Sequence, residues 1–70
     1  MKAQVFLDWM TTTGCRTAAD VAERLGLSRN IAQTMVAAAK AGQDVETKQY
    51  VALAMTALAN GLRPWDTYMR

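Results

Sequence analysis

A run of polar side chains between residues 28 and 34 has the chemistry needed to contact nucleic acid. Arginine can donate two hydrogen bonds to guanine, asparagine and glutamine can pair with adenine, and serine and threonine can bind phosphates or bases. The apolar residues between them place the run on the first turns and outer face of one helix, whose N-terminal end favours a phosphate. The alternative for each residue taken singly is a solvated helix face. As a group we predict DNA contacts for Ser28, Arg29, Asn30, Gln33 and Thr34.

Other residues around this run could reach the phosphate backbone, which is the main source of nucleic-acid affinity. Lys40 and Lys48 flank the connection between the third and fourth predicted helices, although each lysine alone also fits a solvated surface. The acidic residues lie near helix starts, where capping explains them. We also predict phosphate contacts for Arg16, Thr17, Lys40 and Lys48.

The residues that catalysis usually requires are missing. The chain has no histidine, no acid pair at a catalytic spacing and no glycine-rich phosphate loop, and Ser28 has no base to activate it. Cys15 is the only cysteine, so the chain can form neither an internal disulfide nor a thiolate metal cluster, and an incidental thiol is the simpler interpretation than a redox sensor. We expect no enzymatic activity, no metal or other cofactor and no small-molecule effector.

The composition is that of one small globular domain spanning residues 1–70. Hydrophobic residues make up 51% of the chain and charged residues 20%, and the formal net charge of +2 is too small to argue for a nucleic-acid partner by itself. Asp8 interrupts the first apolar stretch, and no apolar run approaches the roughly 18 residues of a membrane helix. The lone cysteine fits a reducing compartment. We expect a cytoplasmic protein with no membrane partner.

Apolar periodicity predicts a first helix over residues 3–13, ended by Gly14. Its apolar stripe is predicted to contain Val5, Phe6, Trp9 and Met10. The start of a second helix is indicated by Thr17 with Asp20, a relative of the capping box, and its end by Gly26. The inward face of this helix is expected to be Val21, Ala22 and Leu25.

Ser28 is the predicted cap of a third helix that ends near Gly42. Its apolar repeat is Ile31, Ala32, Met35, Val36 and Ala39. Asp44 or Thr47 is the predicted cap of a fourth helix, closed by Asn60 and Gly61. One face of that helix is expected to comprise Tyr50, Val51, Ala54, Met55, Leu58 and Leu62.

No stretch alternates with the period of a strand. The predicted fold is therefore all-α, a compact four-helix domain with a short C-terminal extension or an extra helical turn. The C-terminal helix and tail would cover residues 44–70. The tail is too short to build a core, and we predict a dimer interface there formed by Trp65, Tyr68 and Met69.

The sequence "LGLS" between the second and third helices predicts a steep corner. A glycine at the corner permits a positive φ, Leu25 and Leu27 can bury beneath it, and Ala22 is small enough for the next helix to lie across it. Residues 17–41 resemble the helix-turn-helix of small phage and bacterial repressors, the Cro and Xre-like group, in which an alanine stands four residues before the turn glycine. Where that family places Val or Ile six residues after the glycine, this chain has Ala32, preceded by Ile31. This departure implies a slightly rotated third helix.

The resemblance implies a sequence-specific DNA-binding transcriptional regulator. We expect a repressor that binds double-stranded DNA in the major groove, as a homodimer on an inverted-repeat operator. The sequence "ALAMTALANGLRPW" also resembles the closing segment of small phage regulators. This resemblance implies a regulator of a phage or mobile-element operon, a class that includes anti-CRISPR-associated autoregulators. Two alternatives stay open: a protein-interaction module, such as an inhibitor or adaptor on the same fold, and a DNA-architectural accessory protein.

Overall fold

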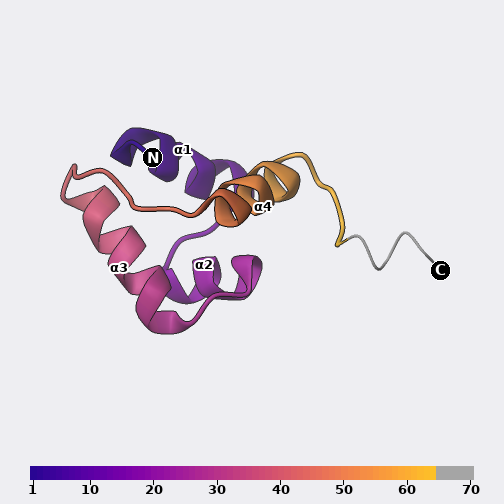
Figure 1. Cartoon of the computed structure of the whole chain (residues 1–70), viewed down its shortest axis with the longest axis horizontal. Coiled ribbons are helices and arrows are strands. Elements are labelled where there is room, and N and C mark those ends of the chain that lie inside the picture. Colours follow the sequence, from indigo (N-terminus) through magenta and orange to yellow (C-terminus); the bar gives the residue numbers. More distant parts are fainter. Residues whose placement is uncertain (65–70) are drawn as a thin grey trace.

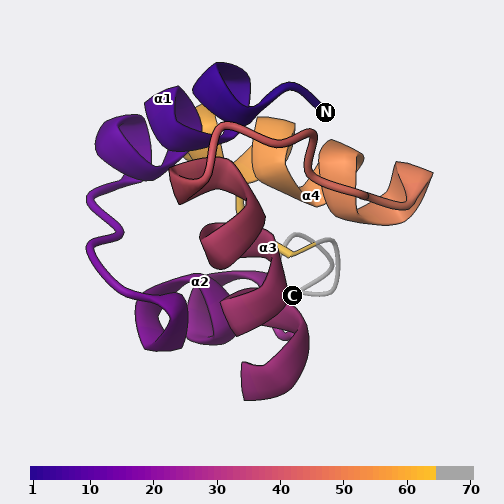
Figure 2. The same cartoon turned by 90° about the vertical axis from the view of Figure 1, so that its left-hand side faces the viewer.

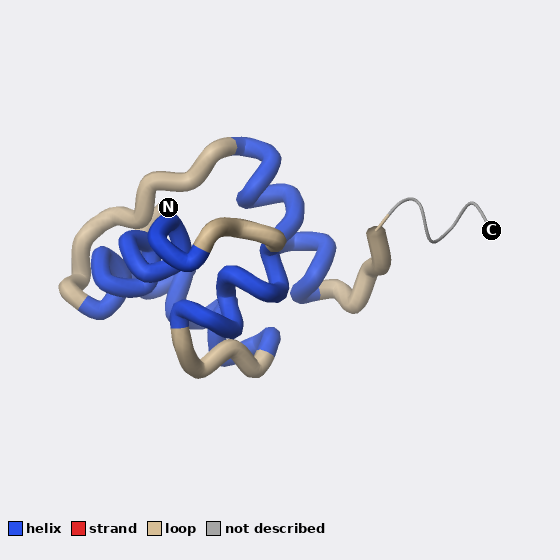
Figure 3. Tube along the Cα trace, turned by 90° about the horizontal axis from the view of Figure 1, so that it is seen from below, coloured by secondary structure: helices blue, strands red, loops and turns tan. Residues whose placement is uncertain are grey.

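The computed structural model describes residues 1–64 and is all-helical, which confirms the predicted fold class (Figure 1). Within this range there is no strand (Figure 3). The predicted interface residues Trp65, Tyr68 and Met69 lie outside the described residues. The helices are α1 (Ala3–Thr13), α2 (Ala18–Leu25), α3 (Arg29–Lys40) and α4 (Gln49–Ala59).

The helix α3 forms the middle of the domain. It packs against α1 at one end and against α2 at the other, while α4 packs against α1 and α2 (Figure 2). The connection over residues 41–48 runs from the end of α3 past the N-terminus of the chain to the start of α4 (Figure 1). This arrangement leaves one flank of α3 facing the beginning of α4.

The helix α1 supplies the aromatic part of the core. Phe6, Trp9 and Met10 are buried as predicted, and the rings of Phe6 and Trp9 lie 6.0 Å apart. The indole Nε1–H of Trp9 donates a 2.8 Å hydrogen bond to the carbonyl of Met55, which ties α1 to α4. Val5 was expected in the same stripe, but it is 54% exposed. Since one residue turns a helix by about 100°, Val5 falls outside the arc that contains Phe6 and Trp9.

Both helices of the α2–α3 segment begin with side-chain caps, as the sequence predicts. The Thr17 hydroxyl accepts a hydrogen bond from the backbone N–H of Asp20, and the Asp20 carboxylate accepts one in return from the N–H of Thr17. The Ser28 hydroxyl accepts from the N–H of Ile31 at 3.3 Å. Each contact satisfies a donor that the first turn of a helix otherwise leaves without a partner.

The start of α4 differs from the prediction. Neither Asp44 nor Thr47 caps it; the N-cap residue is Lys48, and no side chain accepts a hydrogen bond there. The reason lies in the preceding loop, where Val45 is buried and its N–H donates to the carbonyl of Met1 at 2.7 Å. This long-range contact sets the path of the chain into α4, and a local capping pattern contains no information about it.

The inward face of α4 is narrower than predicted. Val51 and Met55 are buried and Leu58 is half-buried, whereas Tyr50 is 64% exposed and Leu62 is 54% exposed. Tyr50 lies about 100° around the helix from Val51, and Leu62 lies beyond the last helical residue. Both therefore fall outside the surface that α1 and α2 cover.

Candidate nucleic-acid interface

The corner between α2 and α3 consists of Gly26, Leu27 and Ser28. Gly26 has a φ of +68°, in the left-handed region that the sequence analysis expected. Its N–H and that of Leu27 both bond to the carbonyl of Ala22, the latter at 3.0 Å, so the end of α2 is closed by backbone contacts. Leu27 is half-buried against the core. The direction in which α3 leaves α2 is thus fixed by local geometry.

The face that α3 turns toward the core differs from the prediction at one residue, Ile31. Ile31 and Ala32 were both expected in the core; Ala32 is fully buried as predicted, but Ile31 is 52% exposed. The other buried residues of the helix are Met35, Val36 and Ala39, so the centre of the inward face lies on the side of Ala32. A methyl group at this position lets α3 lie close to the helices that it packs against. Ile31 consequently stands at the edge of the outer face.

The predicted base-contacting residues are exposed on α3 or at its N-cap. Arg29, Asn30 and Gln33 make no side-chain hydrogen bond or ion pair within residues 1–64, so their polar groups are available to a ligand. The Thr34 hydroxyl donates to the carbonyl of Asn30 at 3.0 Å, and the Ser28 hydroxyl is engaged as the cap. The helix contains no acidic residue that would repel a phosphate.

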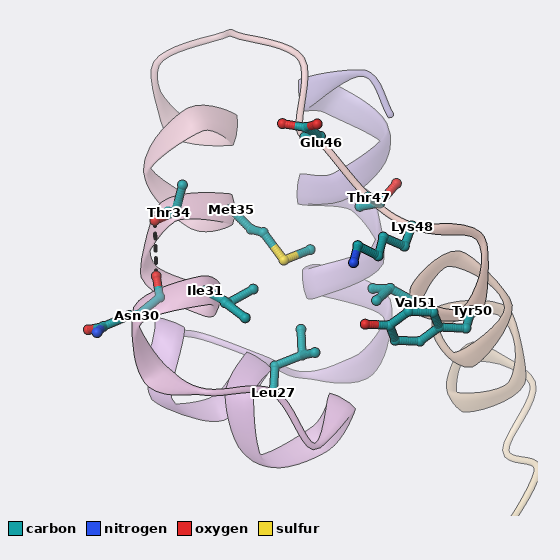
Figure 4. Close-up of a pocket in the computed structure, with 10 residues that line it drawn as sticks. All are labelled: Leu27, Asn30, Ile31, Thr34, Met35, Glu46, Thr47, Lys48, Tyr50 and Val51. Carbon is teal, nitrogen blue, oxygen red and sulfur yellow. Dashed lines mark hydrogen bonds between the residues drawn. The ribbon is translucent and has the colours of Figure 1, made fainter.

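An open groove of about 470 Å³ separates α3 from the segment that leads into α4 (Figure 4). Ile31 and Met35 point into it from α3, and Val51 and Tyr50 point into it from α4. Lys48 stands on the α4 side, and Asn30 and Thr34 also contribute to the lining. The structure therefore brings the predicted phosphate-contacting Lys48 to the same groove as two of the predicted base-contacting residues. This groove was not expected from the sequence, because apolar periodicity predicted both Ile31 and Tyr50 to face the core.

The remaining predicted phosphate contacts are not gathered at this groove. Lys40 is the last residue of α3, so it lies about 17 Å along the helix from Arg29. Arg16 and Thr17 lie at the start of α2, where their backbone N–H groups donate to the carboxylate of Asp20. These hydrogen bonds hold the pKa of Asp20 below its usual value. Because Asp20 already occupies the two N–H groups, a phosphate at this end would have to bind the side chains of Arg16 and Thr17.

Comparisons of the chain with protein-family models, with curated proteins and with solved structures find no match. Among residues 1–64, no three side chains of the metal-binding types lie together. Over the same residues, no helix combines the length and the apolar character required to cross a bilayer.

Proposed function

We propose that this protein is a sequence-specific DNA-binding transcriptional regulator that places the N-terminal half of α3 in the major groove. The observation that carries the proposal is the set of unpaired, exposed side chains of Arg29, Asn30 and Gln33 on a helix without acidic residues. The capped corner at Gly26 supports it, because a reading helix needs a fixed direction relative to the rest of the domain. The interpretation of α2 and α3 as a helix-turn-helix belongs to the same proposal.

The proposed mode of action is repression by occupancy of a promoter. A module this small reads few base pairs, so a homodimer on an inverted repeat, with half-sites about 34 Å apart, would supply the specificity. A cytoplasmic regulator in a phage or mobile-element operon is the setting we propose. The interface would involve Trp65, Tyr68 and Met69.

Selection of bound duplexes from a random DNA pool tests the proposal directly. We expect a palindromic consensus, and an affinity for it that falls steeply as salt is added, because bound lysines and arginines release counterions from DNA. A pool that stays random after repeated rounds, with no salt-dependent binding, would refute DNA recognition.

Two substitutions on α3 test which residues read bases. Arg29→Ala or Gln33→Ala should lower the affinity for the selected duplex by about 1–3 kcal/mol and relax the preference at particular base pairs. Lys2→Ala and Gln43→Ala are matched controls, since they remove the same kinds of group from exposed positions away from the groove. If a variant lost the same amount of affinity for selected and for random DNA, the substituted residue would contact phosphates and not bases.

Removal of residues 64–70 tests the proposed interface. We expect a folded, helical monomer that binds a palindromic site much more weakly, because each half-site would be bound separately. Sedimentation and circular dichroism of the full and shortened chains measure this. A shortened chain that still sediments as a dimer would move the interface elsewhere, and the exposed Leu53 on α4 is the next candidate.

The groove favours a second candidate function, that of a protein-interaction module. Exposed apolar side chains around a concave surface are typical of protein interfaces, and both Ile31 and Tyr50 line this groove. Such a module would not bind DNA, at low or at high salt concentration. An architectural DNA-binding protein would instead bend DNA with little preference for its sequence, which a DNA-bending assay on random duplexes measures.

A further inference from the structure

Ile31 is an exposed apolar side chain at the boundary between the polar outer face of α3 and the groove toward α4. It is the only large hydrophobic residue of α3 that is exposed, and the core position beside it is filled by Ala32. About half of the surface of Ile31 is therefore not covered by the fold. Its place on the helix, next to Asn30 and three residues before Thr34, puts it within one turn of two predicted base-contacting residues.

The chemistry of the major groove offers an isoleucine one specific partner. Of the four bases only thymine carries a methyl group in that groove, at C5, and apolar side chains recognise it by contact. Ile31 points from α3 into the groove toward α4, while Asn30 points away from that groove (Figure 4). Asn30 and Ile31 thus lie about 100° apart around α3, so a base pair contacted by Asn30 or Thr34 would meet Ile31 at the edge of that face toward α4.

We propose that Ile31 contacts the C5-methyl group of a thymine in the bound site and so selects thymine at that position. This inference rests on the proposed DNA-binding function and adds a residue that the sequence analysis assigned to the core. The specificity of α3 then combines hydrogen bonds from Asn30 or Gln33 with an apolar contact from Ile31.

Deoxyuridine substitution isolates this contact, because it removes the thymine methyl and leaves the hydrogen-bonding groups of the base unchanged. Each thymine of a duplex selected from the random pool is replaced singly by deoxyuridine, and binding is measured for the wild-type protein. We expect a loss of about fourfold at the contacted thymine, the effect of burying one methyl group. The symmetry-related thymine of the other half-site should behave in the same way.

The same series on Ile31→Ala assigns the contact to its residue. The variant should bind the thymine duplex more weakly, and removal of the same methyl should then cause little further loss. Val5→Ala is the matched control, since Val5 is a β-branched residue of α1 that is exposed to a similar degree. It should keep the full sensitivity to deoxyuridine. Circular dichroism checks that both variants keep their helices.

Three outcomes would overturn the inference. If no thymine-to-deoxyuridine replacement lowers the affinity of the wild-type protein, Ile31 contacts no thymine methyl group. If the sensitivity persists in Ile31→Ala, another side chain makes the contact. If Ile31→Ala keeps wild-type DNA affinity but dissociates an oligomer in sedimentation, the residue belongs to a protein interface. A protein that selects no duplex at all refutes the proposed function itself, a result separate from these three.

Discussion

The helices α2 and α4 begin in opposite ways. At α2, Thr17 and Asp20 cap each other's backbone N–H groups, whereas α4 begins at Lys48 with no side-chain cap and no acid in its first turn. A lysine at this position also opposes the positive end of the helix dipole. The start of α2 is therefore specified by its own sequence, while α4 depends on its contacts with the rest of the domain.

Those contacts come from both α1 and α2. Val51 and Met55 are the buried residues of α4, and the Met55 carbonyl accepts the hydrogen bond from Trp9. In contrast, α2 and α3 pack on each other, and the N–H groups of Gly26 and Leu27 close the end of α2 by donating to the Ala22 carbonyl. The α2–α3 segment should therefore keep its local geometry under changes that release α4.

The largest effect is expected from Trp9→Ala. It removes a buried aromatic side chain together with the hydrogen bond to α4, and losses of about 3–5 kcal/mol are typical of such truncations. Urea denaturation followed by circular dichroism measures it. Trp9→Phe is the control that keeps an aromatic ring and loses the hydrogen bond, and we expect it to cost about 1 kcal/mol. A Trp9→Ala protein as stable as the wild type would show that α4 is anchored elsewhere.

A smaller effect is expected at the corner. A Cβ added at Gly26 would meet no atom within 4 Å, so the cost of Gly26→Val is the backbone penalty of a β-branched residue at positive φ, about 2 kcal/mol. Gly61→Val at the end of α4 is the matched variant, with a φ of +69° and equally open space. The last turn of α4 can unwind without disturbing the corner. The melting temperature of the Gly61→Val protein should therefore fall less than that of the Gly26→Val protein. Equal losses at both glycines would contradict the difference between the two segments.

The two helix starts should respond to capping substitutions with opposite signs. Thr17→Ala removes a working cap and should destabilise the fold by about 1 kcal/mol. Lys48→Asp supplies a cap and a favourable charge at the start of α4, and should stabilise the fold by about 1 kcal/mol. Urea midpoints of the two variants give the comparison. A loss of stability in Lys48→Asp would mean that its ammonium group makes a contact that a cap does not replace.

The pH dependence of stability should be the smallest effect and should come from α2. Hydrogen bonds from the backbone N–H groups of Arg16 and Thr17 lower the pKa of Asp20 from its usual 3.8. The folded state therefore binds a proton less readily than the unfolded state. The stabilisation that ionised Asp20 contributes is fully present at pH values above its usual pKa of 3.8. It is lost as the pH falls through the lower pKa of Asp20 in the folded protein. Denaturation of the wild type and of Asp20→Asn between about pH 2 and 5 should show this loss in the wild type only.

The parts of the fold that local chemistry determines could be predicted from the sequence. The bounds of α1, the capping pair at Thr17, the cap at Ser28 and the positive φ of Gly26 all follow from interactions between residues near each other in the chain. The uncapped start of α4 could not be predicted in this way. It depends on the pairing of Val45 with Met1, which are far apart in the sequence.

The candidate site was predictable in composition but not in shape. The exposure of Arg29 and Gln33 followed from their polarity and their spacing on the helix. Periodicity predicted both Ile31 and Ala32 to face the core, because it does not determine how close the neighbouring helices come; only Ala32 lies in the closely packed face of α3. The groove, formed by residues from two elements, had no pattern in the sequence that could have indicated it.

The buried position of Cys15 makes its labelling rate a measure of local opening in the domain. Cys15 follows α1 in the connection to α2, is 7% exposed, and its sulfur accepts a hydrogen bond from the Thr13 hydroxyl at 3.4 Å. As the chain's only thiol, it can react with a disulfide reagent only when the core around it opens. The rate of labelling in the native protein therefore reports how often this part of the core opens, without a dye or a mutation.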